Sequence, residues 1–166
     1  MDLAYFDSSV FLAIFNGEPT AVAIKALLRE LKADGCRVCT SIITIQEVSV
    51  LSFRAGTVAT DNYAKVNRLA RIHGISKDIA LTAAKLEAQL KDRFKAGSQK
   101  EQEEHNRRRK WDCFHIATAI DLRCRWLYSL DPGMLGCQER LLIGGVQFSE
   151  PVPRCPELFP DGPAIQ

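Results

Sequence analysis

Short apolar runs that alternate with longer segments of helical periodicity most constrain the fold of this 166-residue chain. Each run is too short for a helix and is apolar on both faces, which is typical of strands buried in a parallel sheet. The alternation therefore predicts an α/β fold of three layers, α/β/α, with a central parallel sheet. We predict strands over residues 3–6, 37–40, 126–130 and 146–148. We predict helices over residues 10–15, 21–31, 44–55, 62–73, 77–95, 111–123 and 134–142.

The length suits one domain with a single core, which we place at residues 1–150. Residues 151–166 hold five of the seven prolines and are expected to form an irregular tail. The net charge of +2 is too small to indicate nucleic-acid binding by overall electrostatics. No apolar run approaches the ~20 residues of a membrane helix, and the N-terminus has no basic segment typical of a signal peptide. We therefore expect a cytoplasmic protein that does not enter a membrane.

Cys36 and Cys39 form a C-x-x-C motif, but no second pair with zinc spacing follows among the six cysteines. The residues between them are predicted to be extended, which would direct the two thiols to opposite faces of a strand. Free thiols are thus favoured over a zinc site.

Four acidic residues are predicted to meet at one edge of the sheet. Asp7 and Asp131 directly follow predicted strands, and Glu47 and Asp112 lie in the first turn or two of predicted helices. In parallel α/β sheets, ligands bind beyond the carboxyl ends of the strands, where the following helices begin. Taken singly, each acid has an ordinary role as a helix cap, a turn residue or a partner of the helix dipole. It is the joint pattern that predicts a functional site.

Such a cluster requires a cation. Two carboxylates ~4 Å apart repel each other by about 1 kcal/mol in water and about 4 kcal/mol at an effective dielectric constant near 20. Four of them would take up protons or destabilise the fold unless a cation neutralised them. A ligand set of oxygens alone favours Mg²⁺ or Mn²⁺, which polarise phosphates and activate water. The pattern thus predicts metal-dependent hydrolysis of a phosphodiester.

Four segments carry a family resemblance: YFDSSVFLAIFNGEP at 5–19, CTSIITIQEV at 39–48, WDCFHIATAI at 111–120 and WLYSLDPGM at 126–134. With these segments the chain resembles the PIN-domain ribonucleases, and among them the VapC-type toxins of bacterial toxin–antitoxin pairs. The resemblance covers about residues 1–150. It implies RNA cleavage by an activated water, with Mg²⁺ or Mn²⁺ held by catalytic acids. It also implies a homodimer and an antitoxin partner. The implied catalytic and metal-binding acids are Asp7, Glu47, Asp112 and Asp131.

Neighbouring polar residues are candidates for holding the acids in place. Ser8, Ser41 and Ser129 are possible hydrogen-bond donors, although Ser8 could serve only as a helix cap. His115 lies one helical turn from Asp112 and could orient that acid or a bound water. The alternative for His115 is a core histidine with a satisfied hydrogen bond.

The polar segment 98–110 ends in a basic cluster that directly precedes the third acid. Four-residue Glu–Arg pairs within it favour a solvent-exposed helix. The sharper hypothesis is that the cluster binds the phosphate backbone of RNA. The candidate RNA-binding residues are Arg107, Arg108, Arg109 and Lys110.

Two other enzyme or signalling folds lack their motifs in this chain. A phosphatase of the haloacid dehalogenase kind would need an acid two residues after Asp7, where this chain has Ser9. A receiver domain would need an acidic pair near its start and a lysine late in the sheet, and neither appears. The alternative from a different class is a non-catalytic RNA- or protein-binding module with a PIN-like fold.

Overall fold

The computed structural model describes residues 2–54, 56, 60–91, 99–141 and 143–154, and of residues 99–108 it describes the backbone. At the centre is a five-stranded sheet of order β3-β2-β1-β4-β5 in which every pair is parallel. Tyr5 on the central strand lies beside Cys39 on one side and Leu127 on the other. The prediction of a parallel sheet is confirmed. The strands are β1 Leu3–Phe6, β2 Arg37–Ser41, β3 Arg71–His73, β4 Trp126–Tyr128 and β5 Gln147–Ser149.

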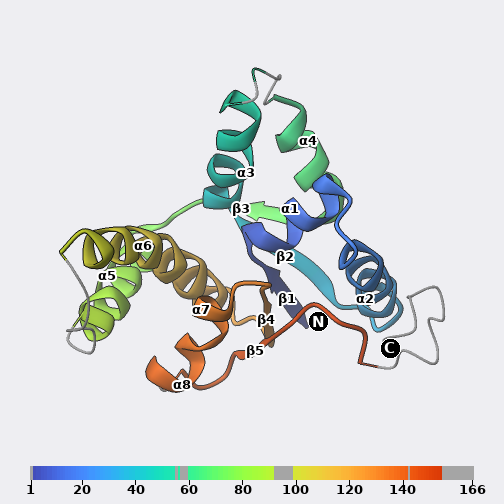
Figure 1. Ribbon diagram of the computed structural model, residues 1–166. Helices are drawn as coiled ribbons and strands as arrows, with labels where there is room; N and C mark the ends of the chain where they lie inside the picture. The colour runs from blue at the N-terminus through green and yellow to red at the C-terminus, as the bar shows by residue number, and fades with distance from the viewer. Residues whose placement is uncertain (1, 55, 57–59, 92–98, 142, 155–166) are drawn as a thin grey trace.

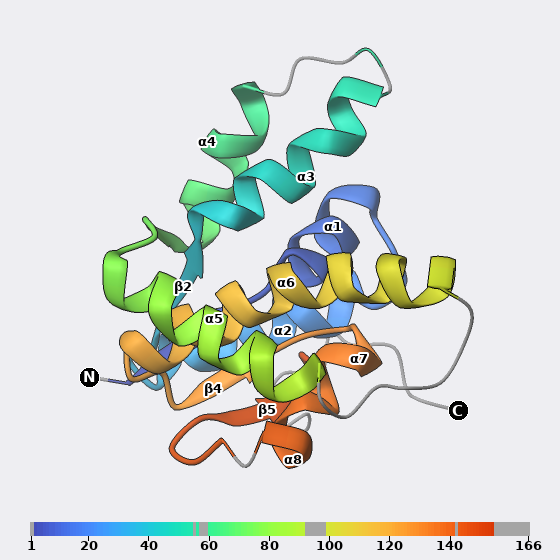
Figure 2. The ribbon, with the colours of Figure 1, turned by 90° about the vertical axis from the view of Figure 1, so that its left-hand side faces the viewer.

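Helices cover both faces of the sheet (Figures 1 and 2), as the apolar runs predicted. Tyr5 and Leu127 point into a core shared with α5, α6 and α8, whereas Phe6 and Trp126 point into a core shared with α1 to α4. In both views α3 and α4 form a pair that extends away from the other helices. The helices are α1 Ser8–Asn16, α2 Ala21–Ala33, α3 Ile42–Arg54, α4 Thr60–Leu69, α5 Lys77–Lys91, α6 Gln99–Asp121, α7 Pro132–Leu135 and α8 Cys137–Leu141.

One predicted helix was wrong at its end. We expected a helix over 62–73, but α4 ends at Leu69 and residues 71–73 form the edge strand β3. Ile72 lies beside Thr40 of β2. Pairing with β2 occupies backbone groups that a helix would have used internally, and a β-branched residue suits that position. Local periodicity could not reveal this pairing because its partner is about thirty residues away.

The helix that carries Asp112 begins at Gln99 instead of 111, so its predicted start was wrong. The helix favoured for the polar segment 98–110 is confirmed over its described backbone from Gln99, and it forms the first half of α6. The predicted helix over 134–142 is divided into α7 and α8 around Gly136. Of the helix expected over 77–95, residues 92–95 lie outside the described residues.

The described start of the tail, residues 151–154, has no regular secondary structure but packs on the domain. Pro151 is buried, and Arg154 pairs with Glu30 of α2. Residues 155–166 lie outside the described part of the chain. Within the described residues, no single helix is long and apolar enough to cross a membrane, although α1 and α2, bent by 119°, pass that test together.

Candidate functional site

Asp7 lies between the end of β1 and the start of α1, and it is buried. Its Oδ1 accepts hydrogen bonds from Ser9 N at 2.9 Å, Ser9 Oγ at 2.6 Å and Val10 N at 3.3 Å. Its Oδ2 accepts from Ser129 Oγ at 2.6 Å. Asp7 itself therefore caps α1, so the alternative of Ser8 as the cap is not realised. Burial raises the pKa of Asp7, while the charge of His115 and the two serine hydroxyls lower it.

Two serines connect Asp7 with the segment that follows β4. Ser129 Oγ accepts from Asp131 N at 2.9 Å, and Ser9 Oγ accepts from Leu130 N at 2.9 Å. Asp131 is exposed and caps the short helix α7 by accepting from Gly133 N at 2.7 Å. A side chain at Gly133 would bring its Cβ to 3.0 Å from the carboxylate. The first and the fourth acid are thus held by one hydrogen-bond network.

Glu47 lies in the second turn of α3, as expected, and it faces α6. Its Oε2 is 2.8 Å from His115 Nε2. Burial opposes charge on both side chains, but their mutual attraction outweighs it, so the pKa of Glu47 is lowered and that of His115 is raised. A hydrogen bond with Ser8 lowers the pKa of Glu47 further. The hydroxyl of Ser41, a candidate donor, accepts a hydrogen bond from Ile43 N at the start of α3.

Asp112 is half-buried and lies in the middle of α6, not in a first turn. The helix dipole therefore does not account for an acid here, since its effect is confined to the first and last turns. Burial raises the pKa of Asp112 to about 7, and the negative charges of Asp131, Asp7 and Glu47 contribute, while His115 opposes them. Asp112 is thus close enough to the other three acids to be affected by their charges. His115, which we had considered as a partner of Asp112, instead contacts Glu47.

The acids fit a hard cation by chemistry, because they offer oxygens only and repel one another without one. In this structure the acids are not yet arranged as a complete set of metal ligands. Among the described residues, no three His, Cys, Asp or Glu side chains already stand together in a group that could hold a metal ion.

The cysteines lie elsewhere. Cys36 belongs to the core on one face of the sheet and Cys39 to the core on the other, as the strand pattern predicted. Cys39 Sγ lies 3.5 Å from Cys124 Sγ, and the five cysteines within the described chain are free thiols. Nothing in this arrangement favours zinc.

The basic cluster is only partly described. Arg109 is buried and donates from Nη1 to Leu90 O at 3.3 Å, so its assignment to RNA binding was wrong. It instead joins α6 to the end of α5. Lys110 is exposed. The side chains of Arg107 and Arg108 lie outside the described residues.

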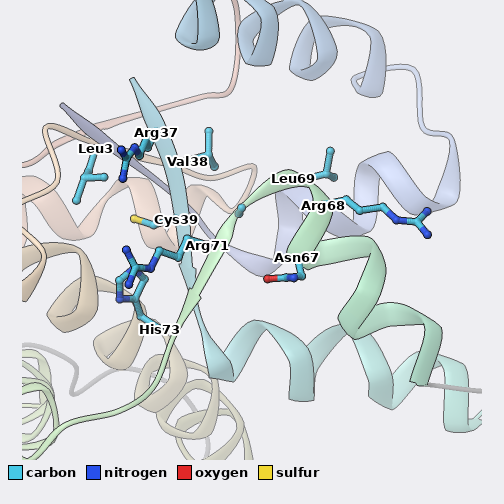
Figure 3. Close-up of a pocket in the computed structure, with 10 residues that line it drawn as sticks. Leu3, Arg37, Val38, Cys39, Asn67, Arg68, Leu69, Arg71 and His73 are labelled. Atoms are coloured by element: carbon cyan, nitrogen blue, oxygen red, sulfur yellow. The ribbon is translucent and has the colours of Figure 1, made fainter. Parts of the chain in front are cut away.

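A hollow of about 480 Å³ lies beside the edge strand β3 and is lined by Arg37, Arg68, Arg71 and His73, among others (Figure 3). None of the four acids lines it. Burial and the neighbouring Arg71 lower the pKa of His73. This hollow is therefore separate from the acidic site.

A model of the PIN domain family matches residues 4–135, a span that contains all four acids. The chain belongs to the PIN domain family. None of the curated proteins compared with this PIN domain matches it significantly.

Solved structures agree on the fold. The PIN domain superposes on a chain of VapBC-1 from nontypeable Haemophilus influenzae with a TM-score of 0.61 and 14% identity, covering 90% of this chain and 98% of that one. A toxin–antitoxin complex from Klebsiella pneumoniae matches with a TM-score of 0.53 and 21% identity, covering 89% of this chain and 97% of that one. VapC20 of Mycobacterium tuberculosis is a toxin that cleaves the sarcin–ricin loop. It matches with a TM-score of 0.55 and 18% identity, covering 79% of this chain and 92% of that one.

Two residues of the site, Ser9 and Tyr5, were not among the candidates predicted from the sequence. Tyr5 donates to or accepts from His115 Nδ1 at 2.6 Å. A signal was present for Tyr5, because a phenol in a buried strand usually needs a hydrogen-bond partner. The identity of that partner depended on the packing of α6.

Proposed function

We propose that this PIN domain is a metal-dependent ribonuclease of the VapC toxin type, which hydrolyses RNA phosphodiester bonds at Asp7, Glu47, Asp112 and Asp131. The observation that carries the proposal is that three acids from other segments converge on the half-buried Asp112, where their charges and burial together raise its pKa to about 7. An acid cluster without a cation lowers the stability of the fold. Strongly shifted pKa values of this kind are concentrated at functional sites. The similarity to VapC20, which cleaves the sarcin–ricin loop, supports the substrate class.

The acids would hold Mg²⁺ or Mn²⁺, which supplies charge opposite a phosphate oxygen and makes a water molecule more acidic. The chain's own residues prepare this site. Ser9 and Ser129 fix both oxygens of Asp7, so that its buried carboxylate keeps one orientation. Asp131 is oriented by Gly133 N and stays exposed to incoming RNA.

We also propose an antitoxin partner, because this fold is shared with VapBC-1 and with a toxin–antitoxin complex, and we propose a homodimer. Phe53 of α3 is 71% exposed and Tyr63 of α4 is 51% exposed. Large apolar side chains at the surface of a protruding helix pair are typical of protein contacts.

The proposal is tested with purified protein and mixed RNA substrates. We expect cleavage with Mg²⁺ or Mn²⁺, none in excess EDTA, and recovery when metal is restored. Asp7→Asn should abolish cleavage, because a neutral amide replaces the most enclosed carboxylate. The matched control is Asp121→Asn, an exposed aspartate at the end of α6, which should cleave like the wild type.

Equal cleavage by Asp7→Asn and the wild type would show contamination and reject the proposal. If the wild type binds RNA but never cleaves it under any metal condition, the chain is a non-catalytic RNA-binding module.

For the basic cluster, now reduced to Arg107, Arg108 and Lys110, we expect their joint change to Ala to weaken RNA binding. Each lost phosphate contact should reduce the slope of log K against log salt concentration by about 0.7 for single-stranded RNA. Binding is measured in the Asp7→Asn background to prevent cleavage. The control changes Lys25, Arg29 and Lys32 of α2 to Ala. If both variants give the same salt dependence of RNA binding, the basic cluster does not contact RNA and the polar segment is only a solvent-exposed helix.

A further inference from the structure

His115 is a buried residue whose two ring nitrogens both have defined partners. Nδ1 lies 2.6 Å from the hydroxyl of Tyr5 on β1, and Nε2 lies 2.8 Å from Oε2 of Glu47 on α3. His115 itself is on α6. The contact therefore joins a strand from the centre of the sheet to two helices, and one of its ends is a proposed catalytic acid.

The donors and acceptors of this chain can be assigned. The backbone N–H of Ser41 donates to the Tyr5 hydroxyl oxygen at 3.1 Å. A tyrosine hydroxyl keeps its proton at neutral pH. That proton is available to His115 Nδ1, which leaves Nε2 of a neutral ring as the N–H that faces Glu47. A protonated ring also presents Nε2–H to Glu47, so the carboxylate receives a hydrogen bond in both states.

The Glu47 carboxylate has fewer nearby hydrogen-bond partners from its own segment than Asp7 or Asp131. Asp7 is held by four hydrogen bonds, and Asp131 is held by its own helix cap. Glu47 has a longer side chain and lies on α3, the helix that extends with α4 away from the other helices (Figures 1 and 2). Apart from Ser8, the contact that the structure describes for its carboxylate is His115.

We propose that Tyr5 and His115 are positioning residues, which hold the Glu47 carboxylate toward the other acids through the chain Ser41 N–H, Tyr5 O–H, His115 N–H. The inference rests on the proposed function, since it requires that Glu47 binds the metal ion. It differs from a core role for His115, because a core histidine would stabilise the fold without affecting metal binding. Partners behind metal-binding residues commonly orient them in this way.

The test compares Tyr5→Phe with Tyr128→Phe. Both remove one hydroxyl from a buried tyrosine on neighbouring central strands, but Tyr128 points into the opposite core, away from His115. We expect Tyr5→Phe to weaken Mn²⁺ binding, measured by electron paramagnetic resonance, or kcat for RNA cleavage, by about 10- to 100-fold. KM for RNA should change little. Tyr128→Phe should match the wild type in both.

Two further variants separate positioning from packing. His115→Leu should lose at least as much Mn²⁺ affinity as Tyr5→Phe. His115→Gln should keep part of that affinity, because its amide N–H can replace Nε2–H. In a Glu47→Gln background, Tyr5→Phe should cause no additional loss, since the carboxylate that it positions is gone.

The inference is overturned if Tyr5→Phe binds Mn²⁺ and cleaves like the wild type. It is also overturned if Tyr128→Phe loses as much Mn²⁺ affinity and activity as Tyr5→Phe. The same holds if Tyr5→Phe lowers activity by the same factor in the Glu47→Gln background as in the wild type. Failure of the proposed function looks different: the wild type itself would neither bind Mn²⁺ nor cleave RNA.

Discussion

Asp112→Asn is expected to lower metal-dependent RNA cleavage at least about 100-fold. A metal ion supplies several kcal/mol of charge stabilisation in such reactions, and about 1.4 kcal/mol corresponds to a factor of ten in rate. The amide is nearly the same size as the carboxyl group, so the packing of α6 should be preserved, with the buried Cys113 and Ile116 still anchoring it. The loss should therefore appear in cleavage and in Mn²⁺ binding, while the circular dichroism spectrum stays unchanged.

The same variant should be more stable than the wild type when metal is absent and the pH is high. Burial and the neighbouring acids raise the pKa of Asp112 from 3.8 to about 7 in the folded protein. Between these values the unfolded chain releases this proton while the folded protein keeps it, so the wild type loses stability as the pH rises from about 4 to 7. One pH unit corresponds to about 1.4 kcal/mol, so the loss is at most about 4 kcal/mol. The variant lacks this group and avoids the loss.

Urea unfolding at pH 5 and pH 8, in EDTA, measures the effect. The stability of Asp112→Asn relative to the wild type should rise between the two pH values, and Mn²⁺ should reverse the order by stabilising only the wild type. Asp121→Asn, at the exposed end of the same helix, should show a much smaller dependence. A difference between Asp112→Asn and the wild type that is equal at both pH values would contradict the electrostatic account of this site.

Arg154→Ala is expected to lower the free energy of unfolding by about 1–3 kcal/mol, because it leaves a buried carboxylate with fewer partners. Arg154 Nε donates to Glu30 Oε1 at 2.6 Å, and its backbone N–H donates to Oε2 at 2.9 Å. The Glu30 side chain is only 6% exposed. The substitution removes the guanidinium contact but keeps the backbone hydrogen bond, which is why the cost stays moderate.

Arg125→Ala is a closely matched control. Both guanidinium groups lie over the ring of Trp126, at 4.6 Å for Arg125 and 4.7 Å for Arg154. Arg125 pairs with Asp2, and these side chains are 65% and 51% exposed. Exposed pairs contribute about 0–1 kcal/mol, so Arg125→Ala should cost less in urea unfolding. Equal losses would mean that stacking on Trp126, rather than the bond to Glu30, explains the contribution of the tail.

The sequence predicted the layered parallel fold because its strands are apolar on both faces, and a strand buried on both faces belongs in a sheet covered by helices. It missed β3, whose three residues contain a single β-branched residue and are stabilised by pairing with β2. Arg154, in the tail beyond the expected domain end at 150, pairs with Glu30 of α2. Both features depend on contacts between residues distant in the sequence.

The four acids were predicted from their places after strands and near helix starts, although the argument for Asp112 used a helix start that does not exist. Its place in the site comes from the packing of α6 across the sheet. Arg109 illustrates the opposite error, since a basic run predicts exposure, yet one member turns inward to Leu90 O.

The sequence by itself determined the strand–helix alternation, the order of the acids and their oxygen-only chemistry, because these depend on residue type and local periodicity. Only the tertiary structure decided that Asp7 caps its own helix, that His115 serves Glu47 instead of Asp112, and that Tyr5 completes this contact. A hydrogen bond between a strand and a helix more than a hundred residues apart depends on how the layers pack, and no local pattern records it.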